Sequence, residues 1–235
     1  TSERDVLRES VKARATHKPL QYITGSTSFM GLELQVDENV LIPRPETEEL
    51  VDHALSRWSS TQKKPTVLDV GCGSGCIALA IKASLPDAVV HGVDISKEAL
   101  AVADQNSSRL DLPIEWHHGS FIEPPVETVW SNAESVDWLL SNPPYIHPDE
   151  SANMHPQVKN FEPHQALFAD DPVGLYRTLW MFAASVLKPG GKLGFECNPL
   201  TIEEVLDIGL RLDFEAEIVS DFQGHRRFIF AERAS

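Results

Sequence analysis

Residues 66–75 read Thr-Val-Leu-Asp-Val-Gly-Cys-Gly-Ser-Gly, and this stretch decides the fold class of the chain. Its first half predicts a buried strand because it is mostly apolar, and its three glycines predict a tight turn. The apolar run from Cys76 to Leu85 predicts a helix directly after the turn. A glycine-rich turn between a strand and a helix is typical of a parallel α/β sheet that binds a ligand at its edge.

The same alternation of strands and helices continues toward the C-terminus. Further strands are predicted at 89–94, 114–118, 137–140 and 191–197, and further helices at 97–109, 175–187 and 203–212. Residues 216–219 and 227–231 predict a closing β-hairpin, joined by Gln223-Gly224. Strands that alternate with helices form a parallel, doubly wound sheet, so we expect the hairpin to add an antiparallel member at one edge.

The first 58 residues follow a different pattern. Residues 3–15 predict a helix, and the short apolar runs between Leu20 and Leu41 predict a small β-hairpin. Prolines delay the next helix until Pro45, and acidic residues at 46, 48 and 49 suit its positive end. The loop before this helix either caps it or lines a functional site, and the sequence leaves both readings open.

Composition narrows the possible functions. The chain has 235 residues, enough for one large α/β domain, and 42% of them are hydrophobic. No run of about 18 apolar residues occurs, and the first residues carry no apolar signal segment, so we expect a cytoplasmic protein without a transmembrane helix. The net charge of −15 disfavours a nucleic-acid or anionic membrane partner.

Cysteine and histidine usage gives no reason to assign a metal site. Cys72, Cys76 and Cys197 are an odd number of cysteines, which favours a reducing compartment. A zinc site would need further cysteines or histidines at set spacings near Cys72 and Cys76. His117 and His118 are adjacent, and neighbouring residues of a strand face opposite sides, so we interpret them as ordinary strand histidines.

The glycine loop and the end of the next strand together predict an adenosine cofactor. Asp94 lies roughly 20 positions beyond Gly71, where a carboxylate can accept hydrogen bonds from both ribose hydroxyls. Dinucleotide sites usually space their glycines G-x-G-x-x-G, whereas this loop has G-x-G-x-G preceded by Asp69. An acid there would repel pyrophosphate but could pair with an ammonium group, so S-adenosyl-L-methionine fits better than NAD.

A second motif, Asn142-Pro143-Pro144-Tyr145, follows the strand predicted at 137–140. Neither proline has an N–H, so regular structure must stop and present Asn142, two backbone carbonyls and the Tyr145 ring. The Asn142 oxygen and the Pro143 carbonyl could accept both hydrogens of a planar NH2 group while the ring covers its face. An ordinary strand exit would look the same, and the glycine motif upstream decides in favour of a site.

Such acceptors suit methyl transfer to an amide or ring-amine nitrogen, whose lone pair is delocalised. They would orient the nitrogen and stabilise the positive charge that develops on it. Each hydrogen bond is worth about 0.5–1.5 kcal/mol when neutral and about 1.5–3 kcal/mol when charge-assisted. Asn142 cannot take a proton at neutral pH, so we expect no side-chain general base and loss of the proton to water.

In these motifs the sequence closely resembles the HemK/PrmC family, the N5-glutamine methyltransferases that modify class-1 peptide chain release factors. The similarity also includes residues 19–25, 41–48, 161–167 and 221–227, and it covers nearly all of the chain after residue 18. The resemblance implies a class I, Rossmann-like α/β methyltransferase fold. This fold would have a mostly parallel seven-stranded sheet with an antiparallel terminal hairpin, plus a small N-terminal β-hairpin.

The resemblance also implies the reaction, which is methylation of the glutamine in a Gly-Gly-Gln tripeptide of the release factor. S-adenosyl-L-methionine would be the donor and S-adenosyl-L-homocysteine the product. The implied catalytic residues are Asn142, Pro143, Pro144 and Tyr145. The implied cofactor-binding residues are Asp69, Gly71, Cys72, Gly73, Ser74, Gly75, Asp94, Ser120, Phe121 and Asn142. We expect a monomer that binds a release factor and neither nucleic acid nor membrane directly.

The chain departs from the family pattern at two places. Members usually carry an N-terminal domain of several helices, so we assign 1–18 as a remnant of that region, 19–42 as a β-hairpin and linker, and 43–235 as the methyltransferase domain. Many members have an acid near the adenine where this chain has Ser120. Phe121 packs either on the adenine or in the core, and Glu162 is either a brace for the loop after the site or a surface acid.

Two other functions remain open at this point. A DNA base N-methyltransferase could use the same Asn-Pro-Pro-Tyr motif on a flipped base, although it would need a basic cleft, and the chain has no Lys/Arg run. A non-catalytic scaffold could retain cofactor binding while it activates a partner protein. The intact Asn142 and glycine loop weigh against a vestigial site.

Overall fold

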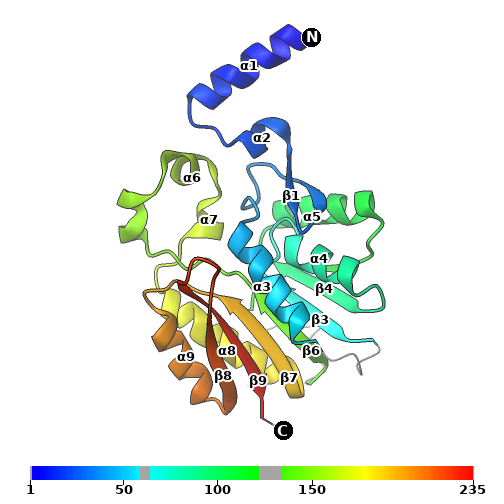
Figure 1. Cartoon of the computed structure of the whole chain (residues 1–235), viewed down its shortest axis with the longest axis vertical. Helices are drawn as coiled ribbons and strands as arrows, with labels where there is room; N and C mark the ends of the chain where they lie inside the picture. Colours follow the sequence, from blue (N-terminus) through cyan, green and yellow to red (C-terminus); the bar gives the residue numbers. More distant parts are fainter. Residues whose placement is uncertain (1, 59–63, 122–133, 235) are drawn as a thin grey trace.

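The computed structural model describes residues 2–58, 64–121 and 134–234, and within them seven strands form one sheet through the middle of the molecule (Figure 1). Their spatial order is β5-β4-β3-β6-β7-β9-β8. The strands are β3 (Thr66–Val70), β4 (Val89–Asp94), β5 (Glu115–His118), β6 (Val136–Ser141), β7 (Leu187–Glu196), β8 (Phe214–Ser220) and β9 (Arg226–Arg233). The predicted α/β class and mostly parallel sheet are confirmed.

The strand order places a functional edge between β3 and β6. From β3 the chain adds β4 and β5 on one side and then crosses to add β6 and β7 on the other, all of them parallel. Ligands bind in the crevice at such a change of direction, outside the carboxyl ends of the strands. The residues that follow β3, β4 and β6 are the glycine loop, the region after Asp94 and the Asn-Pro-Pro-Tyr motif.

The closing hairpin differs from its predicted position in one detail. The antiparallel strand is β9, which lies one place inside the edge and pairs with both β7 and β8. The edge strand is β8, which therefore runs in the same direction as the parallel strands. The sequence predicted the hairpin itself, but which of its two strands joins β7 depends on packing outside the hairpin.

Helices cover both faces of the sheet. They are α3 (Pro45–Ser56), α4 (Cys76–Ser84) and α5 (Lys97–Leu110), then α8 (Pro172–Val186) and α9 (Ile202–Leu210). The six residues of β6 are all buried, and from Trp138 to Leu140 successive side chains alternate between two cores, as the two-residue period of a strand requires. Leu139 joins the core under α8 and α9, whereas Trp138 and Leu140 join the core under α3 and α4.

The N-terminal part contains one element that the sequence analysis missed. The predicted helix is α1 (Glu3–Ala15), which projects from the rest of the molecule and buries none of its residues (Figure 1). The prediction of a hairpin from Leu20 onward was wrong at its start, because α2 (Leu20–Thr24) comes first and ends at Gly25, whose φ is +78°. The hairpin itself is β1 (Ser26–Phe29) and β2 (Leu32–Gln35).

Three short helices between β6 and α8 were also absent from the sequence prediction. They are η1 (Pro148–Asn153), α6 (Pro156–Phe161) and α7 (His164–Leu167). Each is too short to show a helical period of apolar residues. The strand predicted from residue 191 begins instead at Leu187, because a register shift in its pairing with β6 accommodates the Pro-Gly-Gly segment. Within the described ranges, no helix combines the length and apolarity needed to cross a lipid bilayer.

Candidate functional site

A cavity of about 720 Å³ opens at the carboxyl ends of β3, β4 and β6. The structure brings both predicted motifs to its wall. The predicted residues on this wall are Gly71, Cys72, Gly73, Ser74, Asp94, Ser120, Phe121, Asn142 and Pro144. Four other predicted residues, Asp69, Gly75, Pro143 and Tyr145, lie behind the wall rather than on it.

The glycines of the loop after β3 have two different roles. Gly71 and Gly73 have φ values of +72° and +53°, and a Cβ at either would meet no other described atom within 4 Å. These two positions need glycine for their backbone conformation, and they leave open space in front of the loop. Gly75 faces inward, where a Cβ would lie 2.7 Å from Cη2 of Trp116. The third glycine therefore allows close packing of Trp116.

The carboxylate of Asp94 is held in a fixed orientation in which it can accept hydrogen bonds from a ligand in the cavity. Its Oδ2 accepts from the N–H of Gly73 at 2.8 Å, and its Oδ1 accepts from the N–H of Ser96 at 2.9 Å. These bonds fix the carboxylate at the end of β4 and leave lone pairs on both oxygens. Burial raises the pKa of Asp94 above its usual value. Ile95, an exposed apolar residue beside it, also lines the cavity and was missed, although its position directly after the acid was a signal.

Asp69, predicted to pair with a ligand ammonium, lies behind the glycine loop and is not among the residues that line the cavity. Its side chain is fully buried, and Oδ2 accepts from the N–H of Ala78 in the first turn of α4 at 3.1 Å. Its Oδ1 has no hydrogen-bond partner among the described residues. Burial raises the pKa of Asp69 to about 8. In this geometry Asp69 holds the start of α4 under the glycine loop.

Asn142 is tied to residues far away in the sequence. Its Nδ2 donates to Oγ1 of Thr47 at 2.9 Å, and the hydroxyl of Thr47 donates to Oε2 of Glu196 at 2.8 Å. Thr47 comes from the first turn of α3 and lines the cavity, whereas Glu196 ends β7 and is 1% exposed. Burial raises the pKa of Glu196 to about 7. Neither Thr47 nor Glu196 was among the predicted site residues, because only the fold brings them to Asn142.

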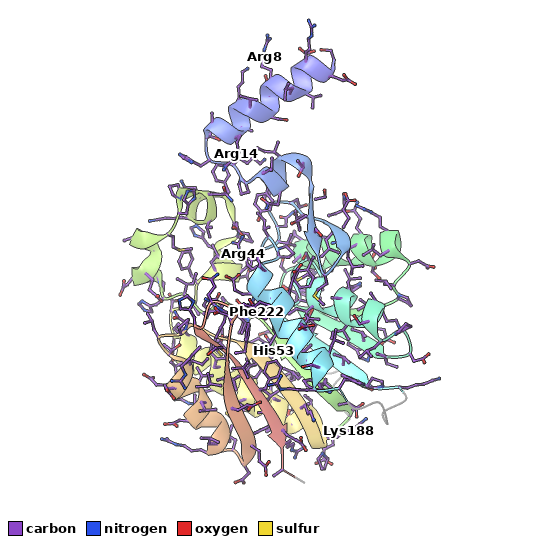
Figure 2. The ribbon with its side chains drawn as sticks, viewed as in Figure 1. Arg8, Arg14, Arg44, His53, Lys188 and Phe222 are labelled. Atoms are coloured by element: carbon purple, nitrogen blue, oxygen red, sulfur yellow. The ribbon has the colours of Figure 1, made fainter. Side chains whose placement is uncertain are left out.

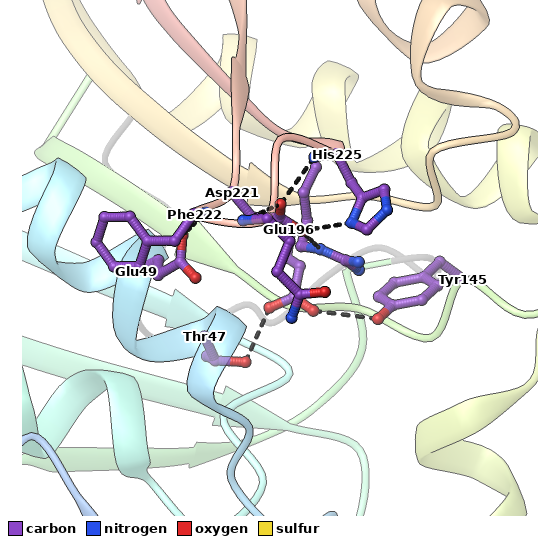
Figure 3. A network of polar contacts seen from close by, with 9 residues as sticks. Thr47, Glu49, Tyr145, Glu196, Asp221, Phe222 and His225 are labelled. Carbon is purple, nitrogen blue, oxygen red and sulfur yellow. Dashed lines mark hydrogen bonds and ion pairs between the residues drawn. The ribbon is translucent and has the colours of Figure 1, made fainter. Parts of the chain in front are cut away.

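Tyr145 faces the same carboxylate from the other side (Figure 3). Its hydroxyl donates to Oε1 of Glu196 at 3.1 Å, and its ring packs against the core under α8 and α9. Burial raises the pKa of the Tyr145 hydroxyl well above its usual range. The ring therefore supports the motif from behind in this structure. Pro143 is buried, while Pro144 reaches the cavity wall.

An ion pair between a buried carboxylate and a partly exposed arginine joins two loops beside the cavity. Oε1 of Glu162 pairs with Nη2 of Arg44 at 2.5 Å, and Oε2 of Glu162 accepts from the N–H of Ile42 at 3.2 Å. Figure 2 shows Arg44 between α3 and the segment that carries α6 and α7. Glu162 is thus a brace and not a surface acid. Arg44 precedes α3 and lines the cavity, so the loop before α3 both starts the helix and forms part of the wall.

Known proteins resemble this chain in both sequence and fold. A family model described as "Methyltransferase small domain" matches residues 48–160. A protein of Flavobacterium psychrophilum named "Release factor glutamine methyltransferase" is 38% identical over 217 residues, covering 90% of this chain and 74% of its own. One of the same name from Enterococcus faecalis is 37% identical over 98% of this chain and 81% of its own. The chain belongs to the release factor glutamine methyltransferase family.

The fold agrees with this family assignment. A methyltransferase from Pyrococcus furiosus superposes over the whole of both chains with a TM-score of 0.65, at 15% sequence identity. A likeness at this level of identity shows the fold alone, which is that of the class I methyltransferases. The predictions of family and fold class are therefore confirmed.

Methyltransferases of this class use S-adenosylmethionine, and the described residues fit that cofactor. The cavity volume is within the range of about 300–1,000 Å³ that is usual for small-molecule sites. The open space in front of Gly71 and Gly73 admits a ligand close to the backbone, and Asp94 offers acceptors for two hydroxyls. Ile95 and Phe121 add apolar surface to the wall. Phe121 also packs against the core and Phe182, so both roles considered for it are compatible with its position.

The predicted strand histidines have a neighbour that the sequence did not indicate. Nε2 of His117 on β5 lies 3.2 Å from Nδ1 of His91 on β4. Oε2 of Glu115 lies 3.3 Å from the same Nδ1 of His91. Ligand atoms of the three residues lie within 4.8 Å of one another. The three share one face because His91 and Glu115 are register partners and His117 follows two residues later. Burial lowers the pKa of both imidazoles. This group lies outside the cavity wall.

Proposed function

We propose that this chain transfers a methyl group from S-adenosyl-L-methionine to the side-chain amide nitrogen (N5) of the glutamine in the Gly-Gly-Gln motif of class-1 peptide chain release factors. The observation that carries the proposal is the orientation of Asn142. One hydrogen of its NH2 group is donated to Thr47, which fixes the amide and leaves its oxygen as the acceptor for a ligand in the same cavity as the glycine loop and Asp94. Family membership names the substrate class.

The residues of this chain would orient and polarise the acceptor amide. Bound S-adenosylmethionine would supply an electrophilic methyl group. The Asn142 oxygen would accept one hydrogen of the glutamine amide, and this bond would strengthen as positive charge develops on the nitrogen. Pro143 is buried behind the cavity wall, so its carbonyl could accept the second hydrogen only if substrate binding exposes it. Charge-assisted bonds of this kind are worth about 1.5–3 kcal/mol each, so most of their effect appears in the transition state. Asp94 and the glycine loop would hold the cofactor beside them.

Proton loss would occur to water. The titratable group closest to Asn142 in the hydrogen-bond network is Glu196, which lies behind Thr47 and not on the cavity wall. The hydroxyl of Tyr145 is already directed to Glu196. After methyl transfer the acceptor nitrogen is strongly acidic, so a side-chain base is not required. We place this activity in the cytoplasm, with a single chain acting on one release factor.

Methyl transfer from labelled S-adenosylmethionine tests the proposal. The acceptors are a purified class-1 release factor, the same factor with the glutamine of its Gly-Gly-Gln loop changed to alanine, and duplex DNA. We expect label on the unmodified factor alone. Asn142→Ala should lower kcat by roughly 100-fold or more, the effect typical of losing one transition-state hydrogen bond, with cofactor affinity retained. Label on DNA would favour a base methyltransferase, and cofactor binding without any transfer would favour a scaffold.

A further inference from the structure

A chain of hydrogen bonds connects Asn142 to a carboxylate that does not reach the cavity. Asn142 donates to Thr47, and Thr47 donates to Glu196, at the distances of 2.9 and 2.8 Å given above. Glu196 is almost completely buried at the end of β7. The hydrogen-bonded path from Glu196 to Asn142 therefore runs through the hydroxyl of Thr47.

The ionised carboxylate fixes the direction of each bond in this chain. A carboxylate can only accept hydrogen bonds, so the hydroxyl of Thr47 gives its single proton to Glu196. The Thr47 oxygen then accepts, and only the NH2 side of the Asn142 amide can donate to it. The two ends of an amide side chain are otherwise nearly equal in shape, and the hydrogen-bond network decides which way it points. The Asn142 oxygen is consequently turned away from Thr47.

The same carboxylate also holds the far end of the motif. Its second oxygen accepts from the hydroxyl of Tyr145 at 3.1 Å, and Figure 3 shows Glu196 between Thr47 and Tyr145. Asn142, through Thr47, and Tyr145, directly, are thus both hydrogen-bonded to the buried carboxylate of Glu196 at the end of β7. A carboxylate with a purely structural role could also link these elements. Such a role would not require hydrogen bonds that fix the orientation of the Asn142 amide through Thr47.

We propose that Glu196 is a positioning residue for methyl transfer, whose carboxylate acts through Thr47 to keep the oxygen of Asn142 facing the acceptor nitrogen. This inference rests on the proposed function, since it requires an acceptor NH2 group in the cavity. A protonated Glu196 can donate to Thr47, whose hydroxyl is then free to donate to the oxygen of Asn142. The amide would turn and present its own NH2 to the NH2 of the acceptor. Activity should therefore fall when Glu196 takes up a proton.

The surroundings of Glu196 determine which groups could mimic this pH dependence. The groups that face it are Arg227 from β9, Glu46 from α3, Cys76 from α4, Tyr176 from α8, Cys197 beside it and Tyr145. Burial raises the pKa values of the two tyrosines and the two cysteines well above neutral pH, and arginine stays charged. His225 pairs with Asp221, which also binds Arg227, so His225→Gln is a required control.

Steady-state kinetics with release factor provides the first test, over about pH 5.5 to 8.5 and at saturating cofactor, so that kcat reports only groups that titrate in the bound enzyme. We expect wild-type kcat to rise with pH around a midpoint of about 7 and then level off. Thr47→Val should lower the plateau about 10-fold, the effect of losing roughly one orienting hydrogen bond, and abolish the rise. Thr47→Ser should restore both, and His225→Gln should keep the midpoint.

Tyr176→Phe is the matched structural control. The hydroxyl of Tyr176 donates to the backbone carbonyl of Glu196 at 2.5 Å, so this variant also loses a buried hydrogen bond to Glu196 but leaves the carboxylate chain intact. We expect it to be destabilised with kcat and its pH profile unchanged. A kcat for Thr47→Val equal to that of Tyr176→Phe would overturn the inference.

The side-chain NH2 signals of Asn142 provide a second readout that needs no substrate. In ¹⁵N-labelled protein we expect them to shift with a midpoint near that of kcat, and to lose this shift in Thr47→Val and Glu196→Gln. Signals that do not titrate in the wild type would refute the hydrogen-bond chain. Wild-type enzyme that fails to methylate any release factor would instead overturn the proposed function, whether or not the amide titrates.

Discussion

The ion pair between Glu162 and Arg44 should respond very differently to the loss of each partner. The side chain of Glu162 is 0% exposed, whereas that of Arg44 is 29% exposed. If Glu162 becomes glutamine, Arg44 can turn toward solvent. If Arg44 becomes methionine, the carboxylate of Glu162 cannot reach water and keeps only the N–H of Ile42. We therefore predict that Arg44→Met destabilises the protein more than Glu162→Gln.

The structure sets the size of this difference. Removing one partner of a buried ion pair costs about 3–5 kcal/mol, because a buried charge is left uncompensated, and Arg44→Met falls in this class. Glu162→Gln keeps one acceptor for two donors and leaves no buried charge, so its cost is about 1–2 kcal/mol, that of a lost hydrogen bond. The double variant, Arg44→Met with Glu162→Gln, also leaves no buried charge. It should therefore be more stable than Arg44→Met alone.

Equilibrium unfolding in urea, followed by tryptophan fluorescence, measures these free energies. The slope m should stay constant across the variants, so that shifts of the midpoint report stability. Glu217→Gln is a suitable control, because it breaks the exposed pair between Arg57 and Glu217 and should cost less than about 1 kcal/mol. A double variant less stable than Arg44→Met, or Glu162→Gln as costly as Arg44→Met, would refute the argument from burial.

Two further predictions concern pH and packing. The pKa values of Asp69 and Glu196, about 8 and about 7, lie above those of the unfolded chain, so the folded protein binds more protons between about pH 4 and pH 8. The free energy of unfolding without cofactor should fall as pH rises through this window. Asp69→Asn should flatten the fall by up to about 1.4 kcal/mol per pH unit, measured by urea midpoints at several pH values; equal slopes would contradict the assignment. Gly75→Ala should destabilise by about 2 kcal/mol or more, because its φ is +80° and its Cβ would overlap Trp116. Gly71→Ala should destabilise less, by about 1–2 kcal/mol from its φ of +72° alone, and should also weaken cofactor affinity because its Cβ would enter the open space in front of the loop. Calorimetric Tm and cofactor titration separate the two, and similar profiles for both variants would show that the glycines do not differ in role.

Local sequence patterns determined the order of the main elements. Strand and helix periods depend on neighbouring residues, so β3, α4, β4 and α5 were predicted to within one or two residues. The short helices were not predicted, because a short segment contains too few residues to show a helical period. The segment between β6 and α8 has no run long enough to show a period, and α2 was taken as part of the hairpin.

The two motifs and their meeting at one sheet edge were also readable from the sequence. Parallel strands place their carboxyl ends together, so the glycine loop, Asp94 and Asn142 had to share an edge once the alternation of strands and helices was recognised. Their resemblance to one family then gave a substrate class, and the relatives' sequences confirm the family.

Only the tertiary structure decided what surrounds Asn142. Thr47 and Glu196 come from α3 and the end of β7, far from the Asn-Pro-Pro-Tyr motif in the sequence, and no sequence pattern pairs either of them with Asn142. The same holds for Asp69, whose place behind the glycine loop depends on how α4 packs. A sequence specifies hydrogen bonds between near neighbours through propensity and period. Bonds between residues 95 and 149 positions apart exist only after burial has closed the chain around them.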